Sequence, residues 1–325
     1  MGEVGLKDRF GRIISYLRVS VTDRCNLRCR YCMPPEGIEL ISHEEILRYE
    51  ELTTILKIFV GLGLKRVRFT GGEPLVREGF VSFLKRVREK FPALGISLTT
   101  NGILLKKFRE ELSSIALDSL NISLDTLDPE KYRCITRLGK IEDVWEGIHA
   151  FLNGKTRLKL NVVAIKGFND DEVLKFVELT KRFNLIVRFI EFMPVNTVVW
   201  KEGDFLSIVE IKEIIEKKYL LKECGYENGA GPAKYYTLPW GGKIGFIGAV
   251  SQHFCENCNR IRLTADGRLR TCLFGGPELD VKKLIRSGLR EGEVSILIRD
   301  ILQHKPKNRF EIAFKEDSYM SRIGG

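Results

Sequence analysis

Residues 13–32 read IISYLRVSVTDRCNLRCRYC, an apolar stretch that runs directly into three closely spaced cysteines. The stretch Ile13–Val21 is rich in Ile and Val and lacks proline, which is typical of a strand in a parallel sheet. Five later segments have the same character: Val67–Thr70, Ile96–Thr99, Leu120–Leu124, Leu158–Ile165 and Ile186–Phe192.

Amphipathic patterns typical of helices separate these strands. The clearest is Glu44–Phe59, which we expect to open with a capping box formed by Ser42 and Glu45. The others are Phe80–Lys90, Asp143–Leu152 and Asp171–Phe183. Strand–helix alternation predicts right-handed βαβ units around a parallel sheet. Because six units are fewer than the eight of a closed barrel, we predict an α/β fold, a partial (βα)6 TIM-like barrel.

The sequence changes character after about Lys217. Glycine-rich turns separate short strand-like runs, Ala233–Leu238 and Ile244–Ile247, and we expect a last helix near Val281–Ser287. We therefore predict two domains: the partial barrel over residues 1–217, and a smaller α+β domain over residues 218–325.

The net charge of +10 favours an anionic partner, although charge alone does not specify a ligand. No apolar run approaches the roughly 20 residues that a membrane span needs. The first ten residues, MGEVGLKDRF, lack the apolar region of a signal peptide. We expect a cytoplasmic protein that does not associate with a membrane.

Six of the eight cysteines form two groups. We call Cys25, Cys29 and Cys32 the N-terminal cysteine set, and Cys255, Cys258 and Cys272 the C-terminal cysteine set. In a cytoplasmic chain such groups indicate metal or redox chemistry rather than disulfides. Cys134 and Cys224 are isolated, and we expect both to be small buried hydrophobic residues.

The N-terminal cysteine set follows the first strand directly and can wrap one face of an iron–sulfur cubane. Three thiolates leave one iron open, as a catalytic metal site requires; a zinc site or chance spacing is the alternative. The turn Gly71-Gly72-Glu73-Pro74 ends the second strand. Its glycines allow a ligand to approach the backbone, and Glu73 can accept hydrogen bonds from an ammonium group. In isolation this motif would be an ordinary turn.

The C-terminal cysteine set provides three more thiolates, with a structural zinc site that includes His253 as the alternative. The residues between Cys258 and Cys272 predict a hairpin around Asp266-Gly267. A three-residue turn pairs Leu263 with Leu269 and Arg262 with Arg270. It places Cys272 on one face with the arginines Arg260, Arg262, Arg268 and Arg270. Such a face suits an anion, most plausibly a phosphate; for Arg268 and Arg270 a solvated strand face is the alternative.

The N-terminal motif, with Tyr31 before its last cysteine, resembles the radical S-adenosylmethionine (SAM) superfamily. The two cysteine sets together are similar to those of the GTP 3′,8-cyclase family. The resemblance covers essentially the whole chain, through the motifs LRVSVTDRCNLRCRYCMP, VRFTGGEPL, LTTNG, NISLDTLD, LNVVAIKGFNDDE and VRFIEFMPV and the closing Gly324-Gly325.

The resemblance implies two [4Fe–4S] clusters, one on each cysteine set, and SAM as cofactors. It implies SAM contacts from Tyr31, Gly72, Ser123 and Met193. It implies GTP contacts from Arg18, Arg68, Thr99, Lys159, Arg260 and Arg262. It implies catalytic roles for Arg18, Arg188, Gly324 and Gly325. It gives no role to Arg268 or Arg270.

The implied reaction converts GTP to (8S)-3′,8-cyclo-7,8-dihydroguanosine 5′-triphosphate, the first step of molybdenum cofactor biosynthesis. A 5′-deoxyadenosyl radical removes the C3′ hydrogen of GTP, and the C3′ radical attacks C8 of guanine. The implied partners are an electron donor and a downstream cyclic pyranopterin monophosphate synthase, with no nucleic acid, for a monomer or homodimer. Two rivals remain: a zinc-stabilised basic nucleic-acid-binding protein, and a radical enzyme that modifies a peptide.

Overall fold

The computed structural model describes residues 5–194, 202–225, 231–312 and 320–323. The chain divides into two compact units, and neither is continuous in sequence. The first comprises residues 1–25, 37–98 and 255–325, and the second comprises residues 26–36 and 99–254.

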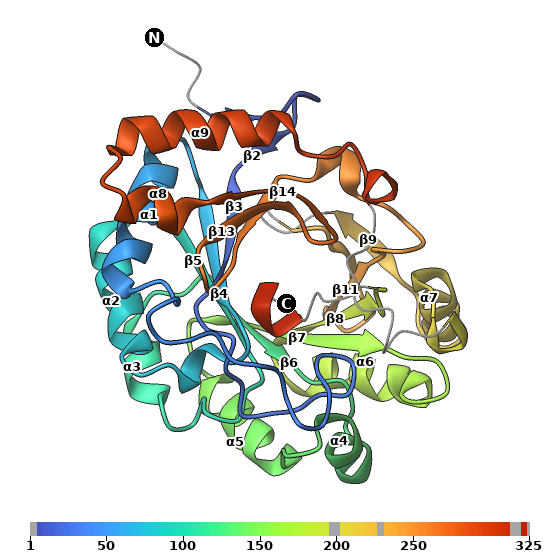
Figure 1. The fold of residues 1–325 in the computed structure, drawn as a ribbon. Helices are drawn as coiled ribbons and strands as arrows, with labels where there is room; N and C mark the ends of the chain where they lie inside the picture. The colour runs from blue at the N-terminus through green and yellow to red at the C-terminus, as the bar shows by residue number, and fades with distance from the viewer. Residues whose placement is uncertain (1–4, 195–201, 226–230, 313–319, 324–325) are drawn as a thin grey trace. The chain divides into compact units, whose positions relative to one another are not determined.

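In the first unit, a sheet has the strand order β14-β13-β12-β3-β4-β5 (Figure 1). Strands β12, β3, β4 and β5 are parallel, and β13 and β14 continue the sheet antiparallel. Strands β1 and β2 form a separate antiparallel pair. The strands are β1 (Leu6–Lys7), β2 (Ile13–Ile14), β3 (Tyr16–Ser20), β4 (Arg66–Thr70), β5 (Gly95–Thr100), β12 (Arg260–Leu263), β13 (Arg268–Cys272) and β14 (Gly275–Asp280).

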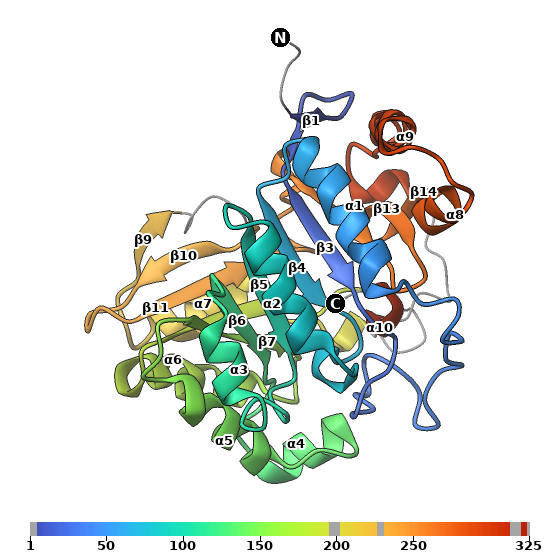
Figure 2. The same ribbon diagram turned by 90° about the vertical axis from the view of Figure 1, so that its left-hand side faces the viewer.

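The helices of this unit are α1 (Tyr49–Gly61), α2 (Phe80–Lys90), α8 (Val281–Arg286), α9 (Glu291–Gln303) and α10 (Met320–Ile323). Helices α1 and α2 run alongside β3, β4 and β5 (Figure 2). Phe69 of β4 packs edge-on against Phe80 and Phe83 of α2, with ring centroids 6.0 and 5.6 Å away. All three rings are buried, and each contributes about 1.5–3 kcal/mol of hydrophobic free energy. Side chains alternate between the two faces of a strand. Arg68 and Thr70, which flank Phe69 in β4, therefore face the other side of the sheet.

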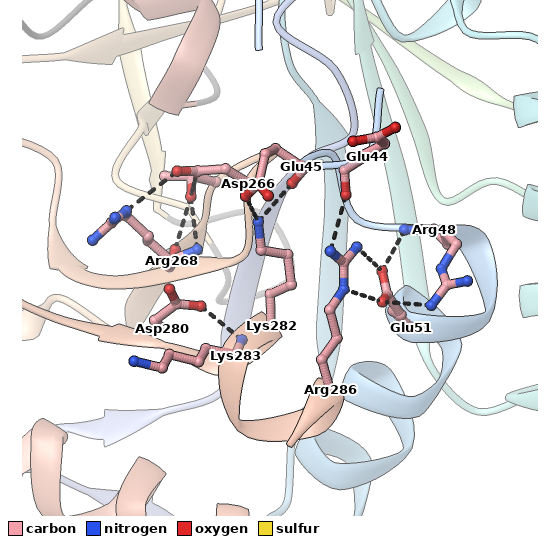
Figure 3. Close-up of polar contacts among 11 residues, drawn as sticks. Glu44, Glu45, Arg48, Glu51, Asp266, Arg268, Asp280, Lys282, Lys283 and Arg286 are labelled. Carbon is pink, nitrogen blue, oxygen red and sulfur yellow. Dashed lines mark hydrogen bonds and ion pairs between the residues drawn. The ribbon is translucent and has the colours of Figure 1, made fainter. Parts of the chain in front are cut away.

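Helices α8 and α9 pack beside α1, so the C-terminal segment joins the N-terminal one in a single unit (Figure 1). Figure 3 shows the polar contacts that hold α8. Arg286 donates to both carboxylate oxygens of Glu51, at 2.7 and 3.2 Å, and to the Glu44 carbonyl at 2.9 Å. Lys282 donates to the backbone carbonyl and the carboxylate of Glu45.

Two sequence predictions in this unit are wrong. Helix α1 begins at Tyr49 instead of Glu44, and its capping box is formed by Arg48 and Glu51 instead of Ser42 and Glu45, whose carboxylate is paired with Lys282. The helix near Val281–Ser287 exists as α8 but is not the last, since α9 and α10 follow it. Helix α9 buries Val294, Ile298 and Leu302, a four-residue spacing that is visible in the sequence.

In the second unit, a sheet has the order β6-β7-β8-β11-β10-β9, with β6, β7, β8 and β11 parallel and β10 and β9 antiparallel. The strands are β6 (Ser119–Ser123), β7 (Arg157–Ala164), β8 (Leu185–Glu191), β9 (Lys222–Gly225), β10 (Lys234–Thr237) and β11 (Lys243–Ile247). The helices are α3 (Arg109–Ser114), α4 (Pro129–Thr136), α5 (Ile141–Phe151), α6 (Val173–Arg182) and α7 (Ile208–Glu216). Short 3-10 turns occur in both units, at Pro74–Val76, Asp170–Glu172, Glu202–Asp204, Cys255–Asn257 and Arg309–Glu311.

Strand β11 pairs with β8, so the second unit contains residues from both sides of the predicted domain boundary at 217. That boundary stays a prediction. In the described part of the chain, no helix is long and apolar enough to cross a membrane.

Candidate active site

The turn at Gly71-Gly72-Glu73 holds the chain that leads into Cys25. The amides of Gly72 and Glu73 donate to the carbonyls of Thr22 and Arg24, each at 2.8 Å. A Cβ on Gly71, whose φ is +147°, would lie 2.4 Å from the Thr22 carbonyl oxygen. A Cβ on Gly72 would lie 2.3 Å from the Arg24 carbonyl oxygen, so neither position tolerates a side chain. The glycines therefore also serve to seat the cysteine loop.

In the second unit, the end of α4 fixes the part of the loop that carries Cys29 and Cys32. The amides of Arg28 and Arg30 donate to the carbonyls of Thr136 and Ile135, at 3.0 and 2.8 Å. The Arg137 guanidinium donates to the carbonyls of Arg28 and Met33, at 2.8 and 2.9 Å. Arg137 has a positive φ of 65°, which is unusual for a residue with a side chain. Sequence reasoning missed Arg137, because an arginine after a helix is normally solvated.

Tyr31 is held by a buried carboxylate that sequence reasoning also missed. Its hydroxyl donates to Asp125 at 2.6 Å, and the other oxygen of Asp125 accepts from the Val163 amide at 2.8 Å. Burial raises the pKa of Asp125 to about 6, against the lowering effect of these two hydrogen bonds. Burial, followed by the nearby Asp125, raises the pKa of Tyr31 well above its usual value, so the phenol stays a donor. Asp125 lies in the NISLDTLD motif, which was the available signal.

The C-terminal cysteine set lies at the two open ends of the β12–β13 hairpin. Cys255 and Cys258 precede β12, and Cys272 is the last residue of β13. Cys255 and Cys258 lie in and just after the 3-10 turn, and the Cys258 amide donates to the Cys255 carbonyl at 3.2 Å. Burial raises the pKa of the Cys258 thiol, but the charges of Arg260 and Lys305 outweigh it and bring the pKa to about 6. Burial raises the pKa of Cys255. The ionised thiol is the form that binds iron, so the low pKa of Cys258 favours its role as a cluster ligand.

The predicted hairpin register is confirmed, with Arg262 opposite Arg270 and Leu263 opposite Leu269. Strand β12 lies beside β3, and β3 beside β4, with Arg262 aligned to Arg18 and Arg18 aligned to Arg68. Side chains aligned in this way share a face of the sheet. Arg68, Arg18, Arg262 and Arg270 thus form one row across four strands, which we call the arginine row.

The charges of the arginine row repel one another. Burial, followed by Arg262 and Arg68, lowers the pKa of Arg18 well below its usual value. Burial, followed by Arg260, lowers the pKa of Arg262 to about 9. Arg270 is 4% exposed and forms an ion pair with Glu278 at 2.9 Å, so the solvated-face alternative is wrong for it. Arg268 is exposed and pairs with Asp266, as that alternative predicts. Two buried cations, Arg262 and Arg270, in one row with the half-buried Arg18 and Arg68 favour a multiply charged anion.

The second unit holds two more buried cations on adjacent strands. Arg188 of β8 donates to the side-chain oxygens of Asn121 and Asn161, at 2.6 and 2.5 Å. Lys159 of β7 lies 5.4 Å from the centre of the Tyr235 ring, and its Nζ is 3.4 Å from the Tyr235 hydroxyl.

The remaining predicted residues lie at strand ends or outside the described residues. Ser123 is the last residue of β6, Met193 follows the end of β8 by two residues, and Thr99 is the next-to-last residue of β5. The Thr99 hydroxyl is buried with no hydrogen-bond partner among the residues described. Gly324 and Gly325 lie outside the described residues. The last described residue before them, Ile323 of α10, accepts a 3.4 Å hydrogen bond from Arg262.

The prediction that Cys134 and Cys224 are buried is wrong, since both are exposed. Cys134 lies on the outer face of α4, whose inner face buries Tyr132 and Ile135. Cys224 lies on the edge strand β9, which is exposed along most of its length. Within the described segments, no group of three Cys, His, Asp or Glu side chains is arranged to hold a single metal ion, and this finding does not discriminate between zinc and an iron–sulfur cluster.

Comparison with known proteins identifies the family. The family model for the Radical SAM superfamily matches residues 19–180, and that for Molybdenum Cofactor Synthesis C matches residues 185–311. A curated relative named GTP 3′,8-cyclase, from Thermodesulfovibrio yellowstonii, is 48% identical over 98% of this chain and 100% of its own length. A second of the same name, from Desulforamulus reducens, is 44% identical over 98% of this chain and 99% of its own length. The chain belongs to the GTP 3′,8-cyclase family.

Solved radical SAM structures share the fold. Streptococcus suis SuiB bound to S-adenosylmethionine superimposes with a TM-score of 0.64 at 13% identity, over 92% of this chain and 74% of SuiB. SuiB bound to the precursor peptide SuiA gives a TM-score of 0.62 at 13% identity, over 82% of this chain and 61% of SuiB. At such identity the likeness shows the fold alone. The predicted fold class, a partial (βα)6 TIM-like barrel with a smaller C-terminal domain, is confirmed.

Membership of the GTP 3′,8-cyclase family also confirms the cofactors, two [4Fe–4S] clusters and SAM. Membership of this family excludes the alternative of a zinc-stabilised nucleic-acid-binding protein. The relatives that match over their full length are named for a reaction of GTP, which disfavours a radical enzyme that modifies a peptide.

Proposed function

We propose that this chain converts GTP to (8S)-3′,8-cyclo-7,8-dihydroguanosine 5′-triphosphate by radical SAM chemistry, the first step of molybdenum cofactor biosynthesis. The curated relatives of the same length carry the name of this activity.

The arginine row is the observation that carries the proposal. Arg68, Arg18 and Arg262 are aligned on three adjacent strands, and burial and mutual repulsion depress the pKa values of Arg18 and Arg262. A nucleoside triphosphate supplies several negative charges to one site and would relieve this repulsion. A neutral peptide backbone would not.

The roles of individual residues follow. Arg18, Arg68, Arg260 and Arg262 would bind the anionic part of GTP, with Thr99 and Lys159 as further GTP contacts. Tyr31, Gly72, Ser123 and Met193 would contact SAM. Arg188, oriented by Asn121 and Asn161, would act in catalysis with Arg18, Gly324 and Gly325.

When bound, SAM and the cluster of the N-terminal cysteine set supply the oxidising radical that removes the ribose C3′ hydrogen. Cys255, Cys258 and Cys272 would hold the second cluster, which would supply a metal ligand position for the guanine base. The protein's own contribution is to fix the ligand loops, through Arg137 and the Gly71-Gly72 turn, and to orient the triphosphate. Enclosure of the site would keep water from the radicals.

The proposal also covers the location of the enzyme in the cell, its oligomeric state and its partners. The enzyme would act in the cytoplasm as a monomer or homodimer, with a one-electron donor. A cyclic pyranopterin monophosphate synthase would consume its product.

Anaerobic incubation with GTP, SAM and dithionite, followed by mass analysis, tests the proposal. The expected products are 5′-deoxyadenosine, methionine and a cyclised nucleotide isomeric with GTP. Cleavage of SAM without any cyclised nucleotide, or modification of a peptide instead, would contradict it.

A further inference from the structure

Lys305 is a buried lysine next to the C-terminal cysteine set, and the proposed reaction assigns it no part. It follows the end of α9 and is 2% exposed. Its Nζ donates to the Arg260 carbonyl at 3.0 Å and to the Thr271 carbonyl. No carboxylate in the described part of the chain forms an ion pair with it. A buried ammonium without a carboxylate is costly, and a nearby negative group lowers that cost.

The two carbonyls that Lys305 contacts adjoin the cysteine ligands. Thr271 precedes Cys272 directly, and Arg260 follows Cys258 by two residues. Burial lowers the pKa of Lys305 overall, although the thiols of Cys258 and Cys272, when ionised, offset part of this lowering. The cysteines beside these two carbonyls therefore supply negative charge close to the Lys305 ammonium when they are ionised.

Arg12 holds the two residues that follow Lys305 and also contacts the C-terminal cysteine set. Its guanidinium donates to the carbonyls of Pro306 and Lys307, at 2.7 and 2.9 Å, and to the Cys255 carbonyl at 2.8 Å. Asp8 holds Arg12 at 2.5 Å. The Lys305 ammonium is therefore held by its own hydrogen bonds, and the backbone that follows Lys305 is held by Arg12. These contacts keep the positive charge near the cysteines.

We propose that Lys305 is a positioning residue that holds a fixed positive charge beside Cys258 and Cys272 and thereby raises the reduction potential of the C-terminal cluster. The inference rests on the proposed function, because that function places a cluster on this cysteine set. Taking up one electron from an external donor makes a thiolate-bound cluster more negative. A fixed cation nearby stabilises the reduced form.

The test is a dithionite titration of the full-length chain, followed by electron paramagnetic resonance. The N-terminal cysteine set is replaced by serine, so that only the C-terminal cluster contributes. Lys305→Met removes the charge and keeps the length of the side chain, while Lys305→Arg keeps the charge. Lys307→Met is the matched control, because the Lys307 side chain is exposed two residues away.

We expect Lys305→Met to lower the equilibrium constant for one-electron reduction about tenfold, which is about 59 mV. Lys305→Arg and Lys307→Met should keep the original potential. If Lys305→Met loses the cluster while Lys305→Arg and Lys307→Met keep it, that result also supports the charge role, since the thiolates would then lack their counter-charge. Equal potentials and iron contents in Lys305→Met and Lys307→Met overturn the inference, as does equal cluster loss in Lys305→Met and Lys305→Arg. If the parent chain with only the C-terminal cysteine set binds no cluster, the proposed function fails as well.

Discussion

Replacement of Arg262 by methionine should stabilise the unliganded protein and weaken GTP binding at the same time. Methionine keeps most of the side-chain volume and removes the charge. Arg262 is 7% exposed and lies between Arg18 and Arg270 in the arginine row. A residue selected only for stability would not show these opposite effects.

The structure gives the size of the stability effect. Burial and then Arg260 lower the pKa of Arg262 from 12.5 to about 9, which corresponds to about 5 kcal/mol at neutral pH. Because the folded pKa lies below the unfolded one, the penalty is fully present below about pH 9 and decreases as pH rises further. Exchange of buried ionic groups for apolar ones typically stabilises proteins by about 1–4 kcal/mol. We expect a gain in that range, or about 2 °C in Tm for each kcal/mol.

The effect on GTP has the opposite sign. Loss of a hydrogen bond to a charged group costs about 1.5–3 kcal/mol, so the Kd for GTP should rise roughly 10- to 150-fold. Anaerobic calorimetry gives the Kd, and thermal unfolding with and without GTP gives both stabilities. Arg268→Met is the control, because Arg268 is exposed and pairs with Asp266 on the surface. The reasoning is refuted if Arg262→Met is less stable and binds GTP normally, or if Arg268→Met weakens GTP equally.

Three further predictions concern the clusters, the C-terminus and the contacts of α8. Anaerobically reconstituted protein should contain about eight irons per chain, and replacement of either cysteine set should halve that number; tightly bound zinc in place of the second cluster would contradict this. Deletion of Gly324 and Gly325 should leave folding, both clusters and SAM cleavage intact and abolish the cyclised nucleotide, whereas full product yield would indicate a frayed terminus. Glu51→Gln should destabilise the fold by about 1–3 kcal/mol in urea unfolding, because Arg286 loses a charge-assisted partner, whereas the exposed Glu50→Gln should have little effect.

Features set by neighbouring residues were predictable from the sequence. The apolar runs became β2–β3 and β4 to β8, because burial of Val, Ile and Phe decides a strand locally. The hairpin register followed from the length of its turn, and this register aligned Arg262 with Arg270. The cysteine spacings pointed to the clusters.

Features set by distant residues were not predictable. The pairing of Glu45 with Lys282, which lies 237 residues further along the chain, is one such feature. The sequence analysis does not single out Lys305 or Arg137, and only the fold shows that both donate to carbonyls near cysteine ligands. The arginine row also needed the structure, since β12 and β3 come from opposite ends of the chain.

Incubation with GTP deuterated at C3′ tests the proposed reaction most directly. Under anaerobic conditions with SAM and dithionite, the 5′-deoxyadenosine should carry one deuterium, and the cyclised nucleotide should have lost it. Unlabelled 5′-deoxyadenosine accompanied by intact, fully deuterated GTP would show that the radical does not act at C3′ and would contradict the assignment.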